Sequence, residues 1–472
     1  MPERILLVLA ALGAVVAGSL VWLSCNGAEV RAGPEAWQPP RIVQVEGAEG
    51  WRNMFPAYGL WLTAAGPDGR TVVLVQDGDI LVSTKAKGGE DGLFPYQAGD
   101  GLLLKFAFDG PRMLLGGKTV CLTLTAQGGG WEWLKTAKPE DLATLRFLNL
   151  PEEIAPATEK SIELALLASL AARNESIGLA LGHPSGVTRV LPLFKPRWLH
   201  LGDVGWDKEV LDVLAQQEHV ETLVVEGKNE GKNLWTLAFL AQFHGLRKLA
   251  INQWNPETTG PFPAGCDRLE TLALMGPKLK DFSPMANLPR LSSLGLVNCP
   301  PVSDAAGLAK LAGLRTLILN GSAVPEDFGT LRELKDLRWL GLPTNVSPKQ
   351  FADLMREHPE LLGVEIVNCP QVTDLAPLRG LKHPEFLVLV DKDKVYKDLG
   401  PLRDLQSLRL VVLAEKTFKE QPDQVADLKK ALPSTQVVMG APLCLGSGWI
   451  LLLVPAVGAA WLLRRWRRPS VA

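Results

Sequence analysis

Two stretches of the chain share an uncommon sequence: LSSLGLVNCPPVSD (291–304) and LLGVEIVNCPQVTD (361–374). Each begins with the pattern L-x-x-L-x-L, in which valine or isoleucine replaces some leucines, and each continues with Val-Asn-Cys-Pro. The alternation of apolar residues in this pattern indicates a short strand with one buried face. Its recurrence predicts a stack of similar units, each too small to form a core of its own.

The pattern returns throughout the region from about residue 190 to about residue 440. Its copies are PRWLHL (196–201), VETLVV (220–225), LRKLAI (246–251), LETLAL (269–274), LSSLGL (291–296), LRTLIL (314–319), LRWLGL (337–342), LLGVEI (361–366), PEFLVL (384–389) and LQSLRL (405–410). From Leu223 to Leu408 the fourth positions follow one another at intervals of 21 to 26 residues. LATLRFLNL (142–150) and IGLALG (177–182) look like degenerate earlier copies.

The residues between the copies must return the chain to the start of the next strand. Ser347-Pro348-Lys349-Gln350 matches a helix capping box with proline at the first helical position, and it precedes FADLMREH. We therefore expect short helices or turns between parallel strands.

These features resemble leucine-rich repeats, both the cysteine-containing variety and, in TDLAPLRGL (373–381), the bacterial internalin type. The resemblance implies an α/β solenoid with parallel strands on its concave face and short helices or turns on its convex face. It also implies that Cys299, Asn345 and Cys369 form a structural ladder, in which a polar side chain caps backbone groups. The chain departs from the family pattern where Trp254, Pro277 and Lys392 occupy the ladder position.

Cys299 and Cys369 are three repeats apart, which corresponds to about 15 Å between stacked strands. A disulfide requires Cα atoms within about 7 Å, so we expect these two cysteines not to pair.

The region before the repeats has a different character. YGLWLTAAGPDGRTVVLVQDGDILVST (58–84) reads as three strands separated by turns, and GDGLLLKFAF and GGKTVCLTLTA continue the pattern. We predict a small antiparallel sheet. The expected division is 1–27 signal peptide or anchor, 28–135 β-rich region, 136–440 repeat solenoid and 441–472 transmembrane helix with an arginine-rich tail.

Two uncharged runs of 21 residues flank this body: Ile5–Cys25 and Leu443–Leu463, the second followed by RRWRR (464–468). A helix of that length rises roughly 30 Å, enough to cross a bilayer. Arginines beyond a span normally remain cytoplasmic, which predicts a main body outside the cytoplasm, in the periplasm or on the cell surface. The first run is either a signal peptide or a retained anchor, and Ser24-Cys25 resembles a lipoprotein processing site. The second is either a permanent anchor or a sorting signal.

Chemistry-bearing motifs were sought and not found. The six cysteines show no metal-ligand spacing, and the six histidines show no HExxH pattern. GGKT (116–119) lacks the first glycine of a phosphate-binding loop and precedes a strand pattern rather than a helix. We therefore predict no catalytic, cofactor-binding or metal-binding residue, and no cofactor. The formal net charge of −2 argues against nucleic acid as a partner.

The concave face is the remaining candidate site. Residues on either side of the fourth position point away from the solenoid core, and the large apolar ones are Trp198, Ile318, Trp339 and Phe386. Exposed apolar side chains of this kind mark protein interfaces. We therefore expect Trp339→Ala to weaken partner capture without loss of stability. The alternative is that helices, loops or the amino-terminal region cover them.

The sequence as a whole predicts a membrane-anchored, extracytoplasmic repeat protein that binds an unidentified protein or other macromolecule and is not an enzyme. Two alternatives stay open: an envelope enzyme with its chemistry in the β-rich region, or a passive surface scaffold.

Overall fold

The fold is seen in a computed structural model. It describes residues 41–46, 63–65, 71–75, 79–83, 93–97, 103–125, 129–154, 161–202, 204–226, 237–252, 262–275, 282–299, 301–302, 306–324, 328–391 and 396–440. The chain divides into two compact units, Met1–Gln38 and Pro39–Ala472. The described residues all belong to the second unit, to which the account below is confined.

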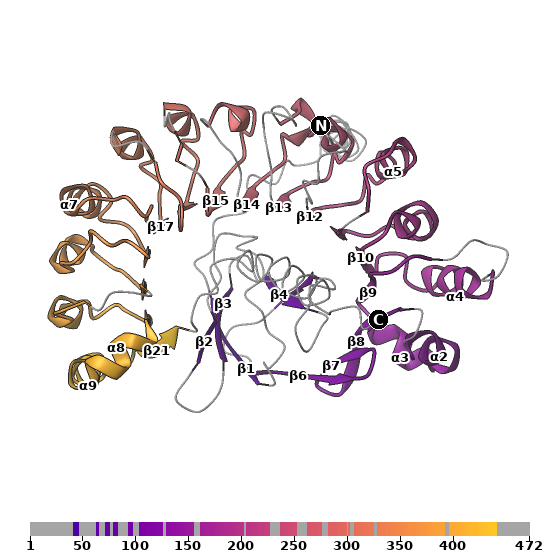
Figure 1. The fold of residues 1–472 in the computed structure, drawn as a ribbon, viewed down its shortest axis with the longest axis horizontal. Coiled ribbons are helices and arrows are strands. Elements are labelled where there is room, and N and C mark those ends of the chain that lie inside the picture. The colour runs from indigo at the N-terminus through magenta and orange to yellow at the C-terminus, as the bar shows by residue number, and fades with distance from the viewer. Residues whose placement is uncertain are drawn as a thin grey trace, which may run out of the picture. The chain divides into compact units, whose positions relative to one another are not determined.

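The repeats form a continuous series of parallel strands, which Figure 1 shows following one another along an arc. Each strand pairs with the next in the chain. The series comprises β8 (Lys118–Thr123), β9 (Phe147–Leu150), β10 (Gly178–Leu181), β11 (Trp198–Leu201), β12 (Thr222–Glu226), β13 (Lys248–Asn252), β14 (Thr271–Met275), β15 (Ser293–Val297), β16 (Thr316–Ile318), β17 (Trp339–Gly341), β18 (Gly363–Val367), β19 (Phe386–Val390), β20 (Leu410–Leu413) and β21 (Gln436–Gly440). The leucine-rich repeat solenoid is therefore confirmed, and the degenerate copies at 142–150 and 177–182 supply β9 and β10.

The repeated leucines explain this stacking. The fourth-position residues lie opposite one another in consecutive strands, and all are 0–1% exposed: Leu199, Leu223, Leu249, Leu272, Leu294, Leu317, Leu340, Val364, Leu387 and Val411. They belong to one hydrophobic core that extends from Leu122 to Val437. Each buried leucine stabilises the folded chain by roughly 1.5–3 kcal/mol, but only while the adjacent repeats cover it.

Short helical turns return the chain on the outer side of the arc (Figure 1). They are α2 (Gly130–Thr136), α3 (Pro139–Thr144), α4 (Ser161–Ala171), η2 (Gly186–Val190), η3 (Leu191–Leu193), α5 (Lys208–Leu214), η4 (Leu237–Gln242), η5 (Ala264–Cys266), η6 (Ser283–Met285), η7 (Ala306–Lys310), η8 (Phe328–Glu333), α7 (Pro348–Glu357), η9 (Ala376–Gly380), η10 (Gly400–Asp404), α8 (Glu415–Glu420) and α9 (Pro422–Ala431). Strands stack about 4.8 Å apart, whereas packed helices need about 8–10 Å. This difference in width bends the stack toward its strands.

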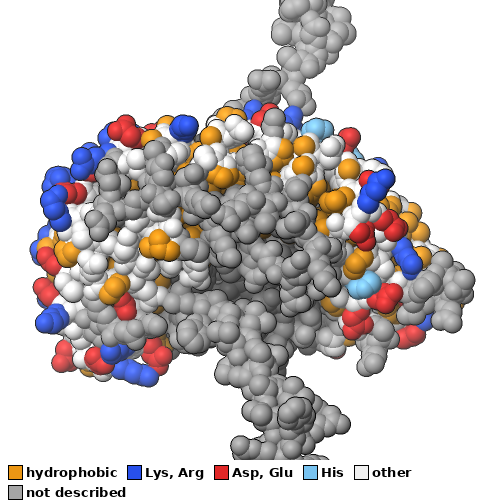
Figure 2. Space-filling model, turned by 45° about the horizontal axis from the view of Figure 1, so that its top comes forward, with side chains coloured by type: hydrophobic (Ala, Val, Ile, Leu, Met, Phe, Trp, Pro, Cys, Tyr) orange, Lys and Arg blue, Asp and Glu red, His pale blue; other side chains and the backbone are white. Residues whose placement is uncertain are grey.

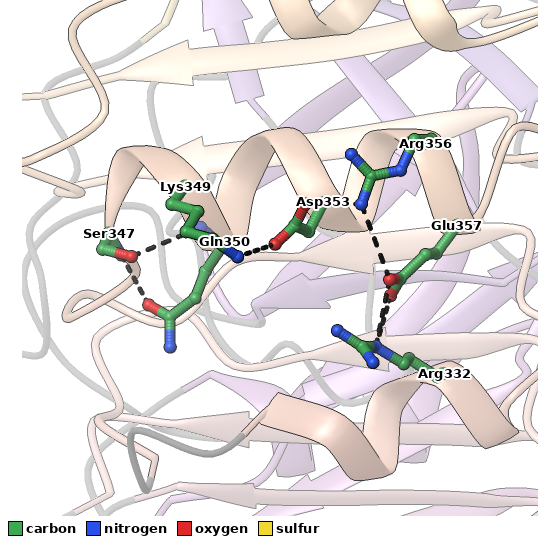
Figure 3. A network of polar contacts seen from close by, with 7 residues as sticks. All are labelled: Arg332, Ser347, Lys349, Gln350, Asp353, Arg356 and Glu357. Carbon is green, nitrogen blue, oxygen red and sulfur yellow. Dashed lines mark hydrogen bonds and ion pairs between the residues drawn. The ribbon is translucent and has the colours of Figure 1, made fainter.

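The predicted capping box is present at the start of α7 (Figure 3). The backbone N–H of Gln350 donates to Ser347 Oγ at 3.3 Å, and the N–H of Ser347 donates to Gln350 Oε1 at 2.8 Å. On the same helix, Asp353 forms ion pairs with Lys349 and Arg356, and these hydrogen bonds hold the pKa of Asp353 below its ordinary value.

The register of the last predicted copy is wrong. The copy LQSLRL (405–410) makes Leu408 the fourth position, but the structure sets Val411 opposite Leu387 and Leu410 opposite Phe386. The repeating unit is therefore Leu408 to Leu413, three residues later. Both alignments place leucines in the core, since Leu405 and Leu408 are also buried. The pattern alone could not distinguish them.

The strands that precede the repeats close the sheet. They are β1 (Arg41–Glu46), β2 (Thr63–Ala65), β3 (Thr71–Val75), β6 (Leu103–Asp109) and β7 (Arg112–Leu115). From β21 the pairing continues through β2, β3, β1, β6 and β7 back to β8, so each of the 19 strands of this sheet has a neighbour on both sides. Only the β1–β6 contact among these is parallel.

The predicted β-rich region is only partly the expected meander. β2 and β3 pair as a hairpin, and so do β7 and β8, whose turn holds Gly116 and Gly117 at positive φ. GGKT is thus a hairpin turn followed by a strand, as its sequence predicted. However, β4 (Asp79–Ser83) pairs with β5 (Leu93–Gln97) in a separate two-stranded sheet and not with β3.

The expected boundary near residue 135 does not coincide with a break in the sheet. β8 pairs antiparallel with β7 and parallel with β9, so this single strand belongs to both regions. Among the described residues, no helix is long and apolar enough to span a membrane. Both predicted membrane segments, 5–25 and 443–463, lie outside the described residues.

Candidate functional site

The four predicted partner-binding side chains lie on the inner side of the sheet. One row of directly paired residues runs across β11 to β19 and contains Trp198, Trp339 and Phe386. Ile318 lies two residues after the point where this row crosses β16. Ile318, Trp339 and Phe386 pack into a hydrophobic cluster that is separate from the leucine core.

The expectation that these side chains are exposed is wrong. Trp198 is 5% exposed, and Ile318, Trp339 and Phe386 are 0% exposed. The inner face is a second packed interior because apolar residues of neighbouring strands join the cluster, namely Val367, Val388, Val390, Leu410, Val412, Ala414 and Val438. At its other end β5 lies against β10 and β11. Truncation of Trp339 should therefore cost roughly 3–5 kcal/mol, contrary to the expectation of unchanged stability. A role in partner contact stays a prediction.

Glycines make room for the aromatic rings on this face. A Cβ atom at Gly363 would overlap the Trp339 ring, which packs against Phe386 at a centroid distance of 5.4 Å. The same arrangement occurs on β9 to β11, where a Cβ at Gly178 would lie 2.6 Å from the Phe147 ring. In both places an aromatic residue, a glycine and a second aromatic residue follow one another on adjacent strands. The glycine thus lets a large ring cover a neighbouring strand.

A buried carboxylate lies within this apolar face. Glu365 is 4% exposed; it accepts a hydrogen bond from Trp339 Nε1 at 2.7 Å and another from Asn320 Nδ2. Burial raises the pKa of Glu365 from 4.5 to about 7, and the two hydrogen bonds lower it in part. Its sequence signal was visible: Glu365 is the one acidic residue in a row that otherwise holds His200, Val224, Ala250, Ala273, Gly295, Ile318, Gly341, Val388 and Val412.

Asn320 connects this carboxylate to the turn after β16. Its Oδ1 atom is buried and has no hydrogen-bond partner among the described residues, and a Cβ atom at Gly341 would lie 2.8 Å from it. Two buried polar side chains and one indole N–H thus form a small network inside an apolar cluster. Such a network is stable only while its members stay mutually hydrogen-bonded.

The predicted ladder residues occupy the same position in their repeats, and Ser322 holds this position in the repeat between Cys299 and Asn345. Asn345 Nδ2 donates to the carbonyl of Val324 at 2.7 Å, and Asn345 Oδ1 accepts from the Val324 N–H at 3.2 Å. The thiol of Cys369 lies 3.4 Å from the carbonyl of Pro343, and the N–H of Cys299 donates to Ser322 Oγ at 3.0 Å. These contacts fit the predicted structural role. Ser322 was missed because serine is common in loops and carries no distinctive signal.

The asparagines of the two Val-Asn-Cys-Pro motifs turn the chain into this ladder. Asn298 and Asn368 have φ values of 53° and 50°, in the left-handed region that asparagine tolerates better than most residues. Cys299 and Cys369 are buried and do not pair with each other, and burial raises the pKa of the Cys299 thiol to about 12. These thiols are therefore packing groups rather than nucleophiles.

In the β-rich region, Cys121 is also buried, and burial raises its pKa far above the ordinary value. A histidine–serine contact occurs after β10, where His183 Nδ1 lies 2.9 Å from Ser185 Oγ. Ser185 Oγ also accepts the N–H of Ile154 at 2.7 Å. This hydroxyl thus joins two adjacent repeats, which is a structural role.

An open groove of about 360 Å³ lies beside the last repeats, where the chain enters β19 and β20. We call it the entry groove. It is lined by Arg379, Leu381, Lys382, His383, Pro384, Asp404, Leu405, Gln406 and Ser407. Arg379 Nε lies 2.7 Å from Asp404 Oδ2, and Ser407 Oγ donates to the carbonyl of Pro384 at 2.7 Å. Sequence analysis did not identify this groove, because its two sides come from different repeats.

No family model matches the sequence, and no curated protein matches it. Among solved structures, internalin C2 of Listeria monocytogenes is 21% identical, covering 43% of this chain and 83% of that one, with a TM-score of 0.29. A leucine-rich repeat protein of Leptospira interrogans is 14% identical, covering 65% of this chain and 93% of that one, with a TM-score of 0.33. The mouse RP105/MD-1 complex is 15% identical, covering 63% of this chain and 59% of that one, with a TM-score of 0.37. These similarities concern the fold alone.

The glycine below Trp339 provides a test of the inner-face packing. Gly363→Ala should lower the free energy of unfolding by about 1–3 kcal/mol, because the added methyl group must displace the ring. Gly380→Ala is the matched control, since its Cβ would lie 3.6 Å from the nearest atom, the carbonyl oxygen of Met355. Urea unfolding of both variants measures the difference. Equal stability of the two variants would contradict the packing described here.

Glu365 should make stability depend on pH. Between pH 4.5 and about 7 the folded chain retains the proton that the unfolded chain has lost, so stability falls as pH rises through this window and then levels off. Across this window the wild-type chain should lose about 3 kcal/mol more of its free energy of unfolding than Glu365→Gln does. Urea unfolding of wild type and Glu365→Gln at pH 5 and pH 8 measures it. Parallel pH profiles for the two chains would rule out a buried, titrating Glu365.

Proposed function

We propose that this leucine-rich repeat chain is a membrane-anchored protein whose repeats lie outside the cytoplasm and bind another protein, without catalysing a reaction. The observation that carries the proposal is the entry groove, an open recess on a rigid stack of repeats. The buried inner face leaves the outer and lateral surfaces as the places where a partner can bind.

Rigidity comes from bonds that cross between repeats at the edge where the chain enters each strand. The backbone N–H of Arg247 donates to the carbonyl of Glu221, and that of Glu270 donates to the carbonyl of Arg247, both at 2.8 Å. Ion pairs follow the same edge, including Arg247–Glu270 at 2.8 Å and Arg409–Glu385 at 3.1 Å. Side chains on this edge are therefore held at fixed spacings, which lowers the entropy lost when a partner binds.

The entry groove has the composition of a polar recognition surface. Lys382, His383 and Gln406 are exposed, and buried Leu381, Pro384 and Leu405 lie beneath them. Charges of both signs lie close together here, and on the face shown in Figure 2 Lys, Arg, Asp and Glu side chains are likewise intermixed along the edges. An intermixed surface fits a protein partner with complementary charges better than it fits a polyanion.

The membrane part of the proposal is supported by the sequence. The runs 5–25 and 443–463 are uncharged and long enough to span, and RRWRR follows the second. The last described strand, β21, ends at Gly440, three residues before the second run begins. The final repeats, which hold the entry groove, would then be the ones closest in sequence to the bilayer.

Reporter fusions test the proposed topology. A periplasm-active reporter fused after Gly440 should be active, and the same reporter fused after Arg468 should be silent, because the arginine cluster keeps the tail inside. The reverse pattern would contradict the orientation, and activity at neither site would contradict an extracytoplasmic body.

The binding proposal is tested with groove variants of the full-length chain. Lys382→Ala with Gln406→Ala should lower recovery of the captured partner at least about fivefold, equivalent to roughly 1 kcal/mol. Stability should change little, because exposed ion pairs contribute roughly 0–1 kcal/mol. Quantitative mass spectrometry of the captured proteins provides the measurement.

Lys349→Ala is the matched control for this experiment. Lys349 is also an exposed lysine in an ion pair, with Asp353, but it lies on α7 away from the groove lining. It should leave capture unchanged. Equal loss in both variants, or no loss in the groove variant, would place the partner elsewhere or favour the passive scaffold.

A further inference from the structure

The closed sheet contains two contacts at which the amino-terminal strands meet the repeats. One joins β7 to β8 at the start of the stack, and the other joins β2 to β21 at its end. These two contacts differ greatly in extent. Their comparison shows where the closed sheet is weakest.

The β7–β8 contact is extensive and buried. Four residue pairs connect the strands, from Arg112–Leu122 to Leu115–Lys118, with one irregularity. Met113, Cys121 and Leu122 are at most 2% exposed. The hairpin turn between the strands also makes this contact local in sequence, so its closure costs little entropy.

The β2–β21 contact is short. Within the described residues it consists of two residue pairs, Ala64–Gly440 and Ala65–Met439, although β21 has five residues. The residues after β2 in the sequence are Gly66 and Pro67. Proline has no N–H to donate to a neighbouring strand. The contact also joins segments more than 370 residues apart, so no short turn holds its two strands together as one does for β7 and β8.

The inner-face hydrophobic cluster reaches this contact. Val438 of β21 and Val412 of β20 belong to the cluster, and the position of a Cβ on Gly440 lies 3.1 Å from both Val390 and Val412. The removal of β2 would therefore free one edge of β21 directly beside apolar side chains. The ordinary closed state keeps that edge paired.

We infer that the closed sheet opens at the β2–β21 contact, so that β2 is a detachable cover for the edge of the last repeat. The β7–β8 contact stays closed during this opening and acts as the attachment point of the cover. The device goes beyond the proposed binding function: it controls access to β21 and to the adjacent inner-face cluster from within the chain.

Hydrogen exchange of the full chain tests this inference without any substitution. Amides at 63–65 and 439–440 should exchange at least about tenfold faster than those at 112–115 and 118–123, because local opening releases only the first set. Exchange at equal rates in the two sets would overturn the inference.

A cross-link provides the second measurement. Directly opposed residues of an antiparallel pair have Cα atoms about 4.5–5.5 Å apart, which suits a disulfide. In Ala65→Cys with Met439→Cys, oxidation should slow exchange at 436–440 at least about tenfold, and reduction should restore it. Failure of the cross-link to form under oxidation, or a formed cross-link without slower exchange, would contradict opening at this contact.

The chain offers a matched control at the other contact. Met113 lies opposite the native Cys121, so Met113→Cys places a disulfide across β7–β8 with a single substitution. This cross-link should leave exchange at 436–440 unchanged. If it slows exchange there as much as the first cross-link does, the opening is global and the inference fails.

Discussion

The structure depends on one constraint: no repeat can bury its own leucines. A strand of three to five residues covers only one side of the row of fourth-position side chains, and the next repeat must cover the other. Parallel stacking satisfies this requirement for every repeat except those at the two ends. At the two ends, side chains of α2 and α9 such as Trp131 and Leu428 join this core. The amino-terminal strands pair with the edges of the stack, β7 with β8 and β2 with β21, so the two regions form one continuous sheet.

Closure of the sheet changes the chemistry of its inner side. In an open stack the residues that alternate with the leucines face solvent, but here they form a second interior with its own aromatic, glycine and valine packing. A carboxylate in this setting is costly, and Glu365 is held by the Trp339 indole and the Asn320 amide. The entry groove lies elsewhere, where adjacent repeats form it at the entry to β19 and β20.

Local patterns in the sequence were sufficient to predict the repeat fold. The spacing of the leucines located nearly every strand, and the capping box located α7, because each depends on residues close together in the chain. Contacts between distant segments could not be predicted in this way. The pairing of Ala65 with Met439 has no sequence signature, and neither has the burial of Trp339. The three-residue error near Leu408 has a different cause, since the pattern fits two registers when leucine occurs at 402, 405, 408 and 410.

A closed sheet also limits how such a chain can change its length. An open solenoid gains or loses a repeat with little consequence, since the ends simply move and the caps follow. Here every strand of the 19-stranded sheet has two partners, so a duplicated or deleted repeat alters the span that β1, β2, β3, β6 and β7 must bridge. Insertions are tolerated in loops between strands, where they leave the strand count intact. The number of repeats in this protein is thus tied to the number of strands that precede them, and the two must vary together.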